Sequence, residues 1–100
     1  MDIKKLLQFT VEAKASDLHL INGIPPTIRV NGELRIIPNE TVLTPEAINA
    51  LLKEILTTEQ VDRLNVNKEI DFSFPFSNLA RFRVNAYTQK SSSWGVPDPN

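Results

Sequence analysis

Two consecutive segments near the end of the chain alternate apolar and polar residues with a period of two. In 70–76, an isoleucine and three phenylalanines occupy every second position. In 81–87, a phenylalanine, a valine and an alanine alternate with two arginines, an asparagine and a tyrosine. Because successive side chains of a strand point to opposite faces, both segments are predicted to be strands with one apolar face. A sheet with one buried and one polar face follows.

Helical periodicity appears in three other places. The segment 2–14 carries apolar residues at helical spacing, with Asp2 as the expected N-cap. Thr44 and a following proline predict the start of a second helix with an apolar stripe. The spacing of Thr57 and Gln60 fits a capping box for a third, short helix. The sequence therefore predicts helices that cover one face of the sheet.

Three short strands are predicted between the first two helices. The segment 17–21 is apolar, and 26–30 and 33–37 flank an Asn-Gly pair, which is a strong hairpin signal. A two-residue loop would place Ile28 opposite Arg35 and mix polar with apolar side chains on both faces. A three-residue loop places Ile28 opposite Leu34 instead. The apolar pattern therefore predicts the three-residue loop with a bulge.

Composition restricts the class of protein. The chain has 100 residues, 41% of them hydrophobic and 23% charged, which is typical of one globular domain. Its 11 basic and 12 acidic residues nearly cancel, so a nucleic-acid partner is not expected. It has no cysteine and a single histidine, so a metal site is not expected. None of its three glycines precedes a lysine, so the sequence lacks a phosphate-binding P-loop.

The order of elements predicts an α+β domain, with an antiparallel sheet of about five or six strands backed by two or three helices. This domain is expected to span residues 1–89. The segment 90–100 has three serines, two prolines and no periodicity. We interpret it as a flexible tail or as residues foreign to the domain.

Arg81 and Arg83 are the main candidate functional residues. They project from the same strand face, and a guanidinium group suits phosphate because it stays charged and donates two parallel hydrogen bonds. The alternative is a solvated face on which Asp71 or Glu69 of the neighbouring strand neutralises one arginine. His19, the single histidine, is interpreted as a partly buried structural residue rather than a catalytic base. No catalytic residue is assigned.

Several short motifs occur together in a familiar order. The sequence resembles the PilT-type ATPases, the motors of type IV pilus retraction and twitching motility, in the segments Ala15–Leu20, Gly23–Pro26, Arg29–Leu34, Leu43–Glu46, Ile55–Thr57, Glu69–Phe74 and Ala80–Tyr87. The resemblance extends from the first residue to about Gln89. Ala-Ser-Asp-x-His is shared with related secretion and pilus-extension ATPases. The Gly-x-Pro-Pro and Arg-Phe-Arg-Val-Asn stretches point to the retraction branch.

The resemblance implies a PAS-like N-terminal domain. The RecA-like motor domain of the family is absent from these 100 residues and would lie beyond residue 100 or be deleted. Members of the family are homohexameric cytoplasmic ATPases at the inner-membrane base of the pilus. The domain would then contact its own motor domain, neighbouring subunits and, through the assembly, the membrane platform. Arg81 and Arg83 would face the nucleotide, with ATP and Mg²⁺ bound in the full-length protein. Without a P-loop, this part alone is not expected to hydrolyse ATP.

Two alternatives remain open at the level of sequence. One is a stand-alone PAS-like sensor of a ligand or protein. The other is the equivalent domain of a related type II secretion or pilus-extension ATPase.

Overall fold

A computed structural model of the chain describes residues 2–77 and 80–89. The elements, in chain order, are α1 (Ile3–Glu12), β1 (Asp17–Ile21), β2 (Thr27–Val30), β3 (Glu33–Ile36), α2 (Pro45–Lys53), α3 (Thr58–Asn67), β4 (Glu69–Ser77) and β5 (Ala80–Tyr87). Among these described residues, no helix has the length and apolar character needed to cross a membrane. The expected tail lies outside the described residues.

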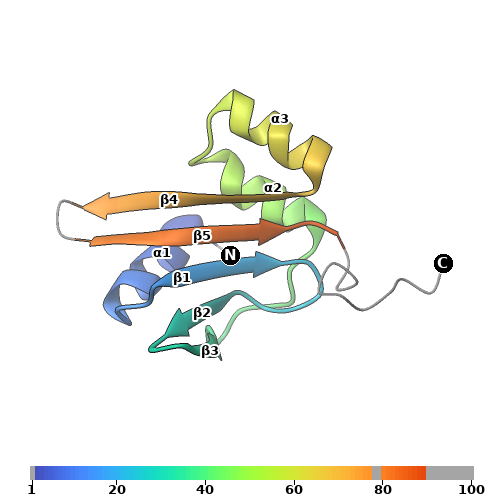
Figure 1. The fold of residues 1–100 in the computed structure, drawn as a ribbon. Coiled ribbons are helices and arrows are strands. Elements are labelled where there is room, and N and C mark those ends of the chain that lie inside the picture. The colour runs from blue at the N-terminus through green and yellow to red at the C-terminus, as the bar shows by residue number, and fades with distance from the viewer. Residues whose placement is uncertain (1, 78–79, 90–100) are drawn as a thin grey trace.

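The strands form one five-stranded sheet in the order β3-β2-β1-β5-β4. In Figure 1, α1 and α2 lie behind the sheet and α3 lies beside β4. The α+β class is confirmed, but the expectation of an antiparallel sheet is wrong for one pair. β1, the central strand, runs parallel to its neighbour β5, and the other pairs are antiparallel. Strand periodicity carries no information on the relative direction of strands so distant in the chain.

The helix starts follow the predicted caps. The Asp2 carboxylate accepts a hydrogen bond from the Lys4 amide at 3.0 Å. The Thr44 hydroxyl accepts one from the Ala47 amide at 3.1 Å. At α3, the Thr57 hydroxyl and the Gln60 side chain exchange hydrogen bonds with each other's backbone amides, as a capping box requires. These caps satisfy amide groups that a helix start leaves without partners.

The hairpin between β2 and β3 differs from the predicted one. Arg29 pairs with Leu34, so the loop contains only Asn31 and Gly32. Both loop residues have positive φ, +52° and +82°, which is typical of the tight turns whose twist matches that of the strands. This register mixes polar and apolar side chains on both faces of the hairpin, which was the argument against it. The mixing costs little free energy here. β3 is an edge strand and all its residues are exposed, so no apolar face is misplaced into a core.

The core lies between the helices and one face of the sheet. β1 and β5 contribute fully buried residues to it, among them Leu18, Leu20 and Val84. Ile70 on β4 is buried, whereas Phe72 and Phe74 are only half-buried against this core. The reason is topological, because β4 forms an edge of the sheet. The predicted apolar face of β4 therefore faces the core, but it is partly exposed to solvent.

Candidate functional site

The face of the sheet opposite the helices carries a row of polar residues drawn from four strands. Arg29 of β2 and Arg83 of β5 flank Asp17 of β1 in register. Ser73 of β4 lies next to Arg83. The row crosses the sheet where β1 begins. Residues from distant parts of the chain are therefore brought together at one end of this face.

Asp17 forms ion pairs with both neighbouring arginines. Its carboxylate oxygens lie 3.6 Å from Arg29 Nε and 4.0 Å from Arg83 Nε. These distances exceed those of a charge-assisted hydrogen bond, which is shorter than 3 Å. The side chain of Asp17 is only 16% exposed, whereas that of Arg83 is 65% exposed. Asp17 therefore holds Arg83 loosely and leaves its guanidinium group accessible.

Ser16 fixes the position of this carboxylate. The Ser16 hydroxyl donates a hydrogen bond to Asp17 Oδ2 at 2.9 Å. The Ser16 amide donates to the Arg29 carbonyl at 2.9 Å, and the Ser16 carbonyl accepts from the Arg83 amide at 3.0 Å. The backbone of Ser16 thus joins β2 to β5 just before β1 begins. The relative positions of the two arginines are set by backbone hydrogen bonds.

An open hollow of about 380 Å³ lies at this end of the sheet. It is lined by Ser16, Asp17, Ser73, Arg81, Phe82 and Arg83. Arg81 is exposed and lies opposite Pro75 of β4. Together with Arg29, the hollow and its border hold three guanidinium groups and one carboxylate. Positive charge is in excess, which favours an anion.

The alternative, in which a β4 carboxylate neutralises one arginine, is not found among the residues that the structure describes. Ser73, rather than an acid, lies opposite Arg83. Asp71 lies opposite Asn85, and Glu69 lies opposite Tyr87. Both carboxylates therefore lie further along the sheet from the arginines, and the counter-ion of Arg83 is Asp17. The alternative reading named the wrong partner because register cannot be read from alternation alone.

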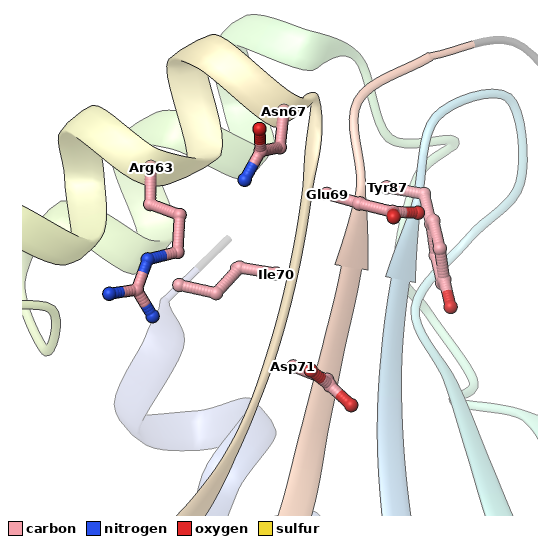
Figure 2. Close-up of a pocket in the computed structure, with 6 residues that line it drawn as sticks. All are labelled: Arg63, Asn67, Glu69, Ile70, Asp71 and Tyr87. Atoms are coloured by element: carbon pink, nitrogen blue, oxygen red, sulfur yellow. The ribbon is translucent and has the colours of Figure 1, made fainter.

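A second hollow, of about 260 Å³, lies at β4 and is lined by Arg63, Asn67, Glu69, Ile70, Asp71 and Tyr87. Figure 2 shows that Arg63 and Ile70 lie on one side of β4, with Glu69, Asp71 and Tyr87 on the other. Its charged groups do not converge on one point. Two carboxylates would also repel a phosphate. This hollow is therefore a poorer anion site than the hollow at Arg83.

His19 lies on the same face, next to Asn85 of β5. Burial lowers the pKa of His19 below its ordinary value of 6.5; nearby Asp17 opposes this effect and Arg29 adds to it. Its Nε2 atom is buried without a hydrogen-bond partner among the described residues. Within those residues, no group of three His, Asp or Glu side chains could hold a metal ion. The histidine is partly buried, as expected from the sequence.

Arg81 and Arg83, whose spacing predicted a shared strand face, both line one hollow in the structure. Sequence reasoning missed Ser16, Arg29 and Ser73 as their neighbours, and did not connect Asp17 with them. The pairing of the first strand with the last makes these residues neighbours. The only sequence signal was the presence of both strands among the motifs that carry the family resemblance.

Comparison with known proteins gives related sequences and a related structure. No protein-family model matches the chain. The type IV pilus retraction ATPase PilT of Pseudomonas aeruginosa is 43% identical over 96% of this chain and 28% of its own length. The type IV pilus ATPase PilU of the same organism is 34% identical over 91% of this chain and 24% of its own length.

The fold is also shared. A crystal structure of the pilus retraction motor PilT with bound ADP superposes with a TM-score of 0.70 and 26% sequence identity. The match covers 90% of this chain and 26% of that one. The chain thus spans about a quarter of the length of the relatives it matches. In sequence and in fold, the chain is the counterpart of the N-terminal region of the PilT-type pilus retraction ATPases.

Proposed function

We propose that this chain is the N-terminal domain of a hexameric ATPase that drives type IV pilus retraction and twitching motility. In this proposal the domain does not hydrolyse ATP by itself. It contacts neighbouring subunits and presents Arg81 and Arg83 to a nucleotide held by the motor domain. The observation that carries the proposal is the 43% identity to PilT across 96% of the chain.

The open hollow supports the role proposed for the arginines. Both guanidinium groups border one depression on the face that the helices leave uncovered. Arg83 is held only at 4.0 Å by its counter-ion, so it can exchange that carboxylate for a phosphate oxygen. A positive charge placed against a phosphoryl group stabilises the charge that develops during transfer. The solved relative contains ADP, which is consistent with such a ligand.

The remaining parts of the nucleotide site would come from the motor domain. In this proposal, ATP and Mg²⁺ would be bound there. The open sheet face would move with the bound nucleotide and transmit its state to the next subunit. We place the assembly in the cytoplasm, at the inner-membrane base of the pilus, next to the platform proteins.

The proposal is tested by ATP turnover in the longer protein that contains this domain. Arg81→Ala and Arg83→Ala should each lower turnover, because each removes a cation from the phosphates. Arg63→Ala is the matched control. Arg63 is also exposed, but it lies on α3, pairs with Glu59 at 4.0 Å and does not line the hollow that holds Arg81 and Arg83. Unchanged turnover in both hollow variants would refute the nucleotide role.

A further inference from the structure

The two edges of the sheet are protected to different degrees. On β4, Pro75 lacks an amide hydrogen, and the pairing with β5 shifts register between Pro75 and Ser77. Proline and bulges are devices that prevent pairing with a further strand. β3 contains neither, and its apolar side chains are unusually open, with Leu34 49% and Ile36 62% exposed. β3 is therefore the edge able to accept another strand.

The outward hydrogen-bonding groups of β3 can be identified. Val30 and Glu33 flank the two-residue turn, so they pair directly with each other. Ile37 donates its amide hydrogen to the Pro26 carbonyl at 2.9 Å, which places the odd-numbered residues of this strand in contact with β2. Hydrogen bonding alternates along an antiparallel strand. The backbone groups of Leu34 and Ile36 therefore point away from the sheet.

We propose that β3 is a self-association surface, on which β3 of a second copy of this chain docks in an antiparallel direction. The symmetric arrangement that fits best places Leu34 opposite Leu34 of the other copy. It brings the outward backbone groups of both leucines together. Each Glu33 then lies opposite an Arg35, and this happens twice because the contact is two-fold symmetric.

Other symmetric registers that satisfy the same backbone groups are unfavourable. If the centre of symmetry moves from residue 34 to residue 33, toward the turn, Glu33 lies opposite Glu33 of the other copy. If it moves to residue 35 instead, Arg35 lies opposite Arg35 of the other copy. Like charges directly opposite each other are destabilising. A further step brings Pro38, which has no amide hydrogen, into the ladder.

The charges on β3 suit this pairing. Charged side chains on an edge strand normally discourage association. Here they are of opposite sign, and they already form an ion pair within one strand, with Arg35 Nη2 3.8 Å from Glu33 Oε2. In the paired arrangement the four charges alternate in sign. Because β3 has only four residues, the contact is small and the association is expected to be weak and concentration-dependent.

The test uses single cysteines, because the chain has none of its own. Under mild oxidation, the Leu34→Cys chain should form a disulfide-linked dimer. Paired residues of this kind have Cα atoms about 5.5 Å apart, within the range that a disulfide spans. Ile36→Cys is the matched control, since it is on the same strand and at least as exposed. In the proposed register, the two copies of residue 36 lie about 13 Å apart and should not crosslink.

Charge reversal tests the ion pairs independently. In the Leu34→Cys background, Glu33→Arg or Arg35→Glu should each reduce crosslinked dimer about tenfold, because two attractive pairs become repulsive. An equal mixture of the two variants should restore crosslinking as heterodimers, since one copy then carries two arginines and the other two glutamates. Equal crosslinking at residues 34 and 36, no crosslinking at 34, or no recovery in the mixture would overturn the proposal.

Discussion

The two faces of the sheet are built from the same strands and differ completely in chemistry. On the face covered by helices, Leu18 and Val84 lie side by side and are fully buried. On the open face, one residue earlier in each strand, Asp17 and Arg83 form a loose ion pair. Figure 1 shows the helices on one side only. Alternate residues of one strand therefore belong to the buried core and to the polar open face.

This separation has a physical reason. Apolar burial contributes roughly 25 cal/mol per Å² of apolar surface removed from water, so the covered face supplies most of the stability. Exposed ion pairs contribute about 0–1 kcal/mol. Residues on the open face can thus be selected for a ligand at little cost to folding. Substitutions on the two faces should differ accordingly.

The largest effect on stability is expected at Phe82, which is 4% exposed and contacts Phe74 with ring centres 5.9 Å apart. Phe82→Ala should lower the free energy of unfolding by about 3–5 kcal/mol, because it leaves a cavity in the core. Urea denaturation of the 100-residue chain measures this. A loss below about 1 kcal/mol would mean that the covered face is not the stabilising one.

A smaller loss is expected at Phe72, which lies on the same face but on the edge strand. Phe72→Ala should cost about 2 kcal/mol, roughly half the cost at a fully buried phenylalanine, because the ring is only half-buried. The same denaturation experiment compares the two variants. If Phe72→Ala costs as much as Phe82→Ala, β4 is covered more completely than the structure indicates.

On the open face, Asp17→Asn should lower the free energy of unfolding by less than about 1 kcal/mol. The variant removes the charge that pairs with Arg29 and Arg83 but keeps the shape of the side chain. Asp62→Asn, at an exposed position on α3, is a control for the change in net charge. A much larger loss at Asp17 would show that this face also stabilises the fold.

The smallest effect concerns pH and His19. Because burial lowers the pKa of His19, the unfolded chain binds more protons than the folded one as the pH falls below 6.5. Stability should therefore decrease on acidification through that range. His19→Gln should remove this part of the pH dependence. Identical stability–pH curves for the two proteins between pH 7 and about pH 5 would contradict the expectation.

Much of the local structure was predictable because short-range signals determine it. Asp2, Thr44 and Thr57 each cap a helix through contacts within three residues. The periodicity of β4 and β5 likewise identified which side chains face the helices. Such features depend on the chain's immediate neighbourhood, which a sequence displays directly.

The errors all concern register or strand direction. The hairpin loop was predicted one residue too long because apolar matching was given more weight than the preference of Asn31 and Gly32 for a two-residue turn. The parallel pairing of β1 with β5 was not predicted, so Asp17 was not recognised as the counter-ion of Arg83. Long-range pairing is set by packing of the whole sheet, which no short segment encodes.

The central claim is that Arg81 and Arg83 serve a nucleotide rather than the fold. It is tested most directly by ATP turnover of the longer protein that carries both Arg81→Ala and Arg83→Ala. Urea denaturation must first show that the two substitutions lower the free energy of unfolding of the 100-residue domain by less than about 1 kcal/mol. We predict that turnover falls about tenfold or more. Turnover equal to that of the unsubstituted protein, with the domain still folded, would contradict the account.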